Sequence, residues 1–259
     1  MDQGPDTADA TQLSLLGGAV AVDDEQLYRL YAYPADLIRC VVRANAIASL
    51  DGGATTGGTS GGLGAAGDRR LFAVQRELAD VIVVGAGTAR AENYGGARMS
   101  IAQRQRRQAR GQGEIPPLAL VTRSGLLEHD LPVLTGSEVR PLVLTAAAAA
   151  DDARSRLRST AEVIDCSAAD PGQVDLAVLL DRLADRGLPR VLCEGGPSLL
   201  GAFIAAGLLD EMCLTSAPIL VGGSAVRIAA GGPDVATRMR RAHVLTDDDG
   251  YLYSRYVRV

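Results

Sequence analysis

The sequence predicts an α/β fold in which helices flank a mainly parallel central sheet that ends in antiparallel C-terminal strands. Short apolar runs alternate with amphipathic segments from residue 68 to residue 206. This alternation is typical of a parallel sheet that is covered on both faces. Beyond residue 210, apolar and polar residues alternate instead, and Asp249-Gly250 separates two such runs. An Asp-Gly pair in that setting indicates a β-hairpin.

The composition limits the classes of protein to which the chain can belong. The chain has 259 residues, 47% of them hydrophobic, and a net charge of −5, which argues against general nucleic-acid binding. All 26 basic residues are arginine, so a lysine Schiff base and a Walker-type phosphate loop are excluded. The sequence contains neither a run of about 18 apolar residues nor a signal-like start, so we expect a cytoplasmic protein without membrane contact.

The N-terminal arm, residues 1–36, is expected to lie outside a domain formed by residues 37–259. The arm is mixed and polar, so we expect a loose segment with a short helix at Glu25–Tyr31. The sequence shows no linker that would divide the rest of the chain.

The expected elements of the domain follow from the period of their apolar residues. Val81–Val84 is a continuous apolar run, as in a strand that is buried on both faces. Asp68–Ala79 has the spacing of an amphipathic helix. The other expected strands are Leu37–Ile47, Leu118–Thr122, Pro141–Thr145, Ala161–Asp165, Val191–Cys193 and Glu211–Ala217, and the other expected helices are Ala148–Arg158 and Val174–Arg186.

An Arg/Gln-rich segment spans residues 100–115. It fits either a basic patch for nucleic acid or a solvated loop or surface helix. No aromatic residues interleave with the arginines, so we favour the solvated segment.

Glycine-rich turns follow three of the expected strands. Gly85 and Gly87 would let the backbone approach a phosphate, with Thr88 at the start of a helix, and Gly196–Ser198 repeats this arrangement. Thr122-Arg123-Ser124 stands at the end of the expected strand Leu118–Thr122, where Arg123 is either a surface residue or a partner for a phosphate. Such turns are often only tight connections, but several in one sheet indicate a dinucleotide site.

Three carboxylates are candidates for the chemistry. Asp51 either orients a substrate or caps a glycine-rich loop, and Asp68 is either a site residue or the N-cap of its helix. Glu194 ends a buried strand and therefore needs partners. Arg76, together with Arg90 and Arg98, either clamps a phosphate or lies on the surface.

Hydrolytic and metal chemistry find little support in the sequence. No G-x-S-x-G motif is present, and the two histidines lack triad or metal spacing. The four cysteines are widely spaced and form no CxxC pair, so we expect buried thiols and no metal site.

Three motifs together resemble a known family. The segments NAIASLDGGATT, ELADVIVVGAGTARAEN and EGGPSLLGAFI, in this order, are similar to the reductase domain of the riboflavin-biosynthesis bifunctional deaminase/reductase. The resemblance covers residues 37–259 and is greatest to stand-alone mycobacterial and actinobacterial members. It implies a dihydrofolate-reductase-like fold, the cofactor NADPH and a homodimer. It also implies reduction of 2,5-diamino-6-ribosylamino-4(3H)-pyrimidinone 5′-phosphate to its ribitylamino form.

The resemblance also implies a role for each matching residue. Asp51 and Asp68 would be the catalytic acids. Residues on the substrate side would be Gly61, Arg76, Gly96, Arg98 and Glu194. Residues that contact NADPH would be Ile47, Gly85, Thr88, Glu92, Thr122, Arg123, Ser124, Gly195, Gly196, Pro197, Ser198 and Leu199, within a run that continues to Ala202.

Two departures from the family affect the expected activity. The H-x-E and P-C-x-x-C motifs of the deaminase are absent, so we expect no deaminase activity. Gly67-Asp68-Arg69 falls where the family varies, which leaves a pterin such as dihydrofolate as a rival substrate. A non-catalytic NADPH-binding protein is the third hypothesis, but Asp51, Asp68 and Glu194 are all retained.

Overall fold

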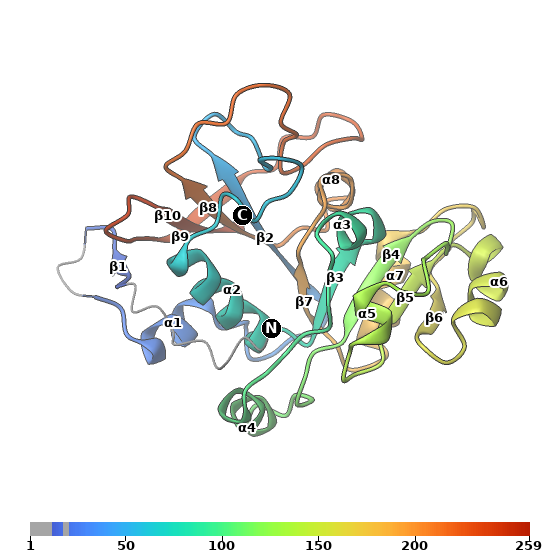
Figure 1. Ribbon diagram of the computed structural model, residues 1–259. Helices are drawn as coiled ribbons and strands as arrows, with labels where there is room; N and C mark the ends of the chain where they lie inside the picture. Colours follow the sequence, from blue (N-terminus) through green and yellow to red (C-terminus); the bar gives the residue numbers. More distant parts are fainter. Residues whose placement is uncertain (1–11, 18–20) are drawn as a thin grey trace.

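The computed structural model describes residues 12–17 and 21–259 (Figure 1). Its strands are β1 (Ser14–Leu15), β2 (Val41–Ser49), β3 (Val81–Gly85), β4 (Leu118–Thr122), β5 (Leu142–Thr145), β6 (Glu162–Asp165), β7 (Arg190–Cys193), β8 (Glu211–Ala217), β9 (Met239–Thr246) and β10 (Leu252–Arg258). Its helices are α1 (Asp24–Tyr31), α2 (Ala66–Leu78), α3 (Ala86–Ala91), α4 (Ile101–Ala109), α5 (Pro132–Thr135), α6 (Ala147–Leu157), α7 (Leu176–Ala184) and α8 (Pro197–Ala205).

All described strands join one sheet in the order β1-β9-β10-β8-β2-β7-β3-β4-β5-β6. Neighbours from β8 to β6 run parallel, whereas β8, β10, β9 and β1 pair antiparallel. The expected α/β architecture with antiparallel C-terminal strands is therefore confirmed. Since parallel strands end at the same edge, the segments that follow β2, β7, β3 and β4 are neighbours in space.

Both faces of the parallel part of the sheet are buried. In β3, Val81 and Val83 pack against one face with α7 and α8, whereas Ile82 and Val84 pack against the other face with α3. Alternate residues of a strand point to opposite faces, so an uninterrupted apolar run fills both layers. This arrangement explains why Val81–Val84 was correctly predicted from its composition alone.

The described part of the N-terminal arm is not loose. Leu13 and Leu27 are fully buried, and Tyr31 is 1% exposed, in a cluster with residues of α2 and the antiparallel strands. Asp23 caps α1 through a reciprocal bond pair with Gln26. The helix expected at Glu25–Tyr31 is confirmed. The expectation that the arm is loose was wrong for its described residues, 12–17 and 21–36. Residues 1–11 and 18–20 of the arm lie outside the described part of the chain. The first long strand also begins later than expected, at Val41.

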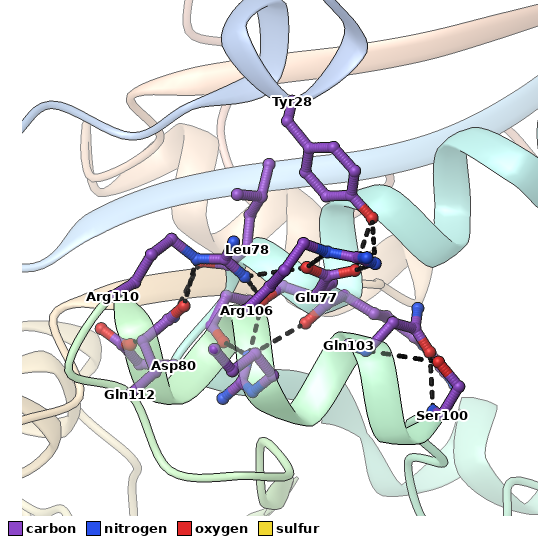
Figure 2. Close-up of polar contacts among 12 residues, drawn as sticks. Tyr28, Glu77, Leu78, Asp80, Ser100, Gln103, Arg106, Arg110 and Gln112 are labelled. Atoms are coloured by element: carbon purple, nitrogen blue, oxygen red, sulfur yellow. Dashed lines mark hydrogen bonds and ion pairs between the residues drawn. The ribbon is translucent and has the colours of Figure 1, made fainter. Parts of the chain in front are cut away.

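The Arg/Gln-rich segment forms the surface helix α4, as expected, and several of its arginines contact the end of α2 (Figure 2). Arg106 and Arg110 both pair with the fully buried carboxylate of Glu77 on α2, and Tyr28 of α1 donates a hydrogen bond to the same group. Arg107, 1% exposed, donates to the carbonyl oxygens of Glu77 and Ala79 at 2.8 and 2.6 Å. These contacts neutralise the carboxylate and satisfy the free carbonyls at the end of α2. The segment thus fixes the helix that carries Asp68 and Arg76.

Two properties of the described chain bear on its class. All four cysteines are free and buried, as expected. Within residues 12–17 and 21–259, no helix has the length and apolar character needed to span a bilayer.

Candidate active site

A cavity of about 390 Å³ opens at the carboxyl edge of the sheet. Its lining comes from strand β2 and the loop that follows it, helices α2 and α3, the turn after β7 and the loop after β8. The sequence-predicted residues that line it are Ile47, Asp68, Thr88, Glu92, Glu194, Gly195, Gly196 and Pro197. They come from four separate segments, which the fold brings to one edge of the sheet.

The glycine turns after β3 and β7 touch each other at one side of the cavity. The Gly85 amide donates to the Gly195 carbonyl at 2.8 Å. A Cβ atom on Gly196 would lie 2.0 Å from Thr88 Oγ1, which is far below contact distance, and Gly195 has a φ of +86° that favours glycine. Both glycines are therefore required for the close approach of the two turns.

Helix α8 begins at this junction with unsatisfied backbone amides. Its N-cap is Gly196, which offers no side chain, whereas Asp23, Ser100 and Asp175 cap α1, α4 and α7. Pro197 occupies the first turn, where its missing N–H costs nothing. Free amides and the positive end of the helix dipole favour an anion at this position.

Glu194, which precedes the glycine turn after β7, is held by a bidentate ion pair with Arg76. Arg76 Nε and Nη2 each donate to one carboxylate oxygen of Glu194 at 2.7 Å, and Tyr94 Oη donates to Oε2 at 2.9 Å. The side chains of Glu194 and Arg76 are 2% and 18% exposed. The surface interpretation of Arg76 is thus wrong, and Arg76 is engaged with Glu194. The Arg76 guanidinium also stacks on the ring of Phe72 at 4.2 Å.

Asp68 is the third residue of α2, in the first turn of the helix, and it lines the cavity. The N-cap is Ala65, so the capping interpretation of Asp68 is wrong. Thr215 Oγ1 donates to Asp68 Oδ1 at 2.7 Å. Burial raises the pKa of Asp68, which the Thr215 hydrogen bond only partly offsets. A half-buried carboxyl with a raised pKa in a cavity is a candidate proton donor.

Asp68→Asn is expected to lower kcat by about 100-fold or more, because the proton donor is lost. The same change should raise Tm near neutral pH, since the ionised carboxylate destabilises the fold at pH values above its raised pKa. The gain in Tm should shrink as the pH falls toward about 4, the pKa of an unfolded aspartate. Measurements of turnover and Tm for the wild type and Asp68→Asn across this pH range check both effects. Equal Tm values for the two proteins at every pH would contradict the claim that the ionised Asp68 carboxylate destabilises the fold.

Asp51 lies outside the cavity lining and fastens a loop. Its carboxylate accepts from Ser49 Oγ at 2.6 Å and from the amides of Val221 and Gly222 at 3.1 and 2.6 Å. These hydrogen bonds lower the pKa of Asp51 to about 2. An acid that stays ionised is a poor proton donor at neutral pH. The geometry therefore favours the capping alternative for Asp51, and Val226, farther along the fastened loop, lines the cavity.

Asp51→Ala is expected to raise KM by less than about tenfold and to leave kcat nearly unchanged, because only the position of the loop is relaxed. The KM effect should not vary with pH between about 5 and 9, since the native carboxylate is ionised throughout that range. Steady-state kinetics at several pH values test this expectation. A large loss of kcat would instead restore Asp51 as a catalytic residue.

The remaining predicted residues lie outside the cavity lining. Thr122, Arg123 and Ser124 end β4, two strands away from β7 along the same edge, with Arg123 and Ser124 exposed. Gly61 lies in an open turn, and Arg98 is exposed. A Cβ atom on Gly96 would lie 2.5 Å from Ser137 Oγ, so this glycine serves packing. Ser198 is exposed on α8, and Leu199 packs in the core.

Several lining residues were missed by the sequence analysis. They are Asn45, Phe72, Tyr94, Val226 and Ile228. Phe72 and Tyr94 carried a usable signal, because aromatic residues make up only 3% of the chain. Val226 and Ile228 sit in an irregular loop whose residues match no motif, so no signal was available for them.

Within the described residues, no group of three or more His, Cys, Asp or Glu side chains is placed to hold a metal ion. The polar groups around the cavity are instead the backbone amides at the start of α8, which donate, the carboxylates, which accept, and hydroxyls. This set suits an organic, partly anionic ligand.

The chain is similar in sequence and fold to several known proteins. Residues 40–253 match the family described as the RibD C-terminal domain. The chain is 30% identical, over 82% of its length and 96% of the relative, to a Methanothermobacter thermautotrophicus protein named 2,5-diamino-6-ribosylamino-4(3H)-pyrimidinone 5′-phosphate reductase. A pyrimidine reductase-like protein from Corynebacterium diphtheriae superposes with a TM-score of 0.76 and 30% identity over 90% of this chain and 98% of that one. The yeast riboflavin biosynthesis reductase Rib7 shares the fold, with a TM-score of 0.65 over 90% of this chain and 98% of its own, at 16% identity.

Proposed function

The chain belongs to the RibD C-terminal domain family and is an oxidoreductase, and we propose that it reduces 2,5-diamino-6-ribosylamino-4(3H)-pyrimidinone 5′-phosphate to the ribitylamino form with NADPH. One observation supports this most directly. One cavity holds both the uncapped start of α8, between the two glycine turns, and two carboxylates, the buried Glu194 and the half-buried Asp68. The first part suits a dinucleotide diphosphate, and the second suits a polar substrate beside it.

The residues at the glycine turns fit NADPH. The amides at the start of α8 would bind its diphosphate, and the glycines leave the space that side chains would fill. Arg123, exposed at the end of β4, would reach the 2′-phosphate of the adenosine ribose. When bound, NADPH supplies the hydride that the reaction requires.

The chain's own residues would position the substrate and donate the proton that the reduction requires. Asp68 would hold a proton at neutral pH more readily than an exposed aspartate, because burial raises its pKa. It would donate that proton to the oxygen or nitrogen on which charge develops. Glu194, fixed by Arg76 and Tyr94, would accept hydrogen bonds from substrate hydroxyls without having to reorient. The enclosing loop would exclude water from the reacting groups.

The direct test is NADPH oxidation with the pyrimidinone phosphate as substrate, and with NADH in place of NADPH as the comparison. We expect turnover with NADPH and a larger rise in Tm with NADPH than with NADH, because a ligand of the folded state stabilises it. The absence of both turnover and a Tm shift would refute the proposal.

Dihydrofolate is a second candidate substrate, favoured by the buried carboxyl of Asp68, which can hold a protonatable pterin ring. Comparison of kcat/KM for dihydrofolate and the pyrimidinone phosphate decides between them. We expect the pyrimidinone phosphate to have the higher value.

A further inference from the structure

The C-terminal hairpin of β9 and β10 contacts the segment that leads into α2. Tyr251 and Tyr253 are 7% and 1% exposed, and their rings stack at 6.1 Å with an angle of 10° between their planes. Tyr251 Oη donates to the carbonyl oxygen of Leu63 at 3.0 Å. Since α2 begins at Ala66, this hydrogen bond fixes the approach of the chain to the helix.

Gly67, in the first turn of α2, lies directly against the hydroxyl of Tyr253. A Cβ atom on Gly67 would lie 2.2 Å from Tyr253 Oη and 3.0 Å from Asp247 Oδ2. Glycine weakens a helix relative to alanine, and the close approach of the tyrosine accounts for a glycine here. Ala65 gives α2 no side-chain cap, so tertiary contacts such as this one set the position of the first turn.

Asp247 orients the Tyr253 hydroxyl. Its Oδ2 accepts from Tyr253 Oη at 2.6 Å, and its Oδ1 accepts from the amides of Asp249 and Tyr251 at 3.1 and 3.0 Å. Asp247 is 7% exposed, and the three hydrogen bonds fix its carboxylate within the hairpin turn. The hydroxyl therefore presents a fixed surface to Gly67.

A second contact on the first turn of α2 comes from the strand beside Tyr253. Tyr253 of β10 pairs with Thr215 of β8, and Thr215 Oγ1 donates to Asp68 Oδ1 at 2.7 Å. Side chains of directly opposite strand residues lie on the same face of a sheet. Tyr253 thus contacts the backbone of Gly67, while its strand neighbour holds the side chain of the next residue. A shift of this turn relative to Tyr253 would disturb the hydrogen bond between Thr215 and Asp68.

We propose that Tyr253, oriented by Asp247, is a positioning residue that places the first turn of α2 so that Thr215 holds the carboxyl group of Asp68 in the cavity. This rests on the proposed function, because it takes Asp68 to be the proton donor. Neither Tyr253 nor Asp247 lines the cavity, so both act on the reaction through Asp68.

The ionisation of Asp68 reports whether it is correctly placed. Burial raises the pKa of Asp68, and the hydrogen bond from Thr215 lowers it, so loss of that bond would raise the pKa further. Arg69, which also interacts with Asp68, stays charged at all relevant pH values. The other titratable groups that interact with Asp68 are tyrosines whose pKa values burial raises, namely Tyr31, Tyr251 and Tyr253.

Tyr253→Phe is the direct test, because it removes only the hydroxyl. We expect kcat for the pyrimidinone phosphate to fall roughly tenfold, since the proton donor is misplaced. The alkaline limb of the kcat profile, along which Asp68 loses its proton, should move to higher pH. KM and the Kd of NADPH should stay within about twofold of wild type. Thr215→Val should move the limb in the same direction, and Tyr253→Phe should then add no further effect, because the hydroxyl acts through that hydrogen bond.

Tyr33→Phe is the matched control, because it also removes a buried hydroxyl, one that donates to the Val191 carbonyl oxygen at 3.2 Å. It should lower Tm but leave kcat and its pH profile unchanged. If Tyr253→Phe affects kcat and the pH profile no more than Tyr33→Phe does, its role is merely structural and the proposal is overturned. Additive effects of Tyr253→Phe and Thr215→Val would also overturn it.

Gly67→Ala tests the same contact from the helix and replaces Tyr253→Phe if that variant does not fold. The added Cβ atom would lie 2.2 Å from Tyr253 Oη, so the first turn of α2 must move. We expect kcat to fall about 100-fold and the alkaline limb to move to higher pH. A folded Gly67→Ala protein with the wild-type kcat profile contradicts the proposal.

The two proposals fail in different ways, because the ionisation of Asp68 can be followed without turnover. Carbon-13 NMR of the aspartate carboxyl groups, with the Asp68 signal assigned through Asp68→Asn, follows its titration in each protein. If Tyr253→Phe moves this titration to higher pH only when Thr215 is present, but the chain does not oxidise NADPH with the pyrimidinone phosphate, only the proposed function is refuted. Turnover of this substrate with an unchanged kcat profile and NMR titration in Tyr253→Phe refutes only the inference.

Discussion

Arg76→Met is expected to destabilise the folded protein by roughly 3–5 kcal/mol and to abolish turnover, because it leaves the buried carboxylate of Glu194 without its counter-charge. Glu194 is 2% exposed, and Arg76 supplies two of the three hydrogen bonds that satisfy it. Tyr94 alone would remain as a donor. The charge must then be hydrated or neutralised at the cost of the surrounding packing.

Urea unfolding of a double-mutant cycle measures this effect. Arg76→Met with Glu194→Met should recover much of the lost stability, since apolar residues often replace a buried ion pair without penalty. The double variant should stay inactive, because the substrate-facing carboxylate is gone. Arg104→Met breaks exposed ion pairs on α4 and should cost less than about 1 kcal/mol. Similar losses for Arg76→Met and Arg104→Met would show that the Glu194 pair is not buried in solution.

Gly196→Ala is expected to lower kcat/KM by about 100-fold, because a displacement of roughly 1 Å at the glycine junction misplaces both ligands. The added Cβ atom would lie 2.0 Å from Thr88 Oγ1, so the turns after β3 and β7 must separate. Binding of NADPH should weaken in parallel, since the start of α8 moves with Gly196.

Removal of the clashing atom provides the control. Gly196→Ala combined with Thr88→Ala leaves only the residue 88 Cβ atom, at 3.4 Å, which is an ordinary contact. This pair should bind NADPH more tightly than Gly196→Ala and about as tightly as Thr88→Ala alone, which measures the loss of the Thr88 hydroxyl. Gly113→Ala, whose Cβ atom would meet only the Ile115 carbonyl at 3.9 Å, should have little effect. If the double variant binds NADPH no better than Gly196→Ala, the clash is not the cause.

The fold was largely predictable because its signals are local. Val81–Val84 shows burial on both faces through its own composition, and Asp249-Gly250 marks the final hairpin within a few residues. The start of the first long strand was harder, since Leu37–Cys40 is also apolar but does not pair with a neighbour. Apolar character alone does not distinguish a strand from the approach to it.

The candidate site was predictable only where a motif carried it. Glu194 was expected to need partners, but Arg76 is 118 residues away and its pairing depends on how α2 lies across the sheet. The next residue, Glu77, points to α4, so a single step along α2 separates a site residue from a packing residue. Asn45 lines the cavity but was missed, because no motif marks it and its partner Gln75 lies on a helix 30 residues away. Such pairings are set by tertiary packing, which local patterns do not encode.

The packing of α1 on α2 makes the N-terminal segment and the reductase domain one cooperative unit. Leu13, Leu27 and Tyr31 cover the same cluster as Leu71 and Val74 of α2. A shortened chain that began at residue 37 would expose this apolar surface to water and would leave Glu77 without Tyr28. Amide protons of α1 and α2 should therefore exchange through the same opening event, because the two helices share the cluster that supports the helix of Asp68 and Arg76.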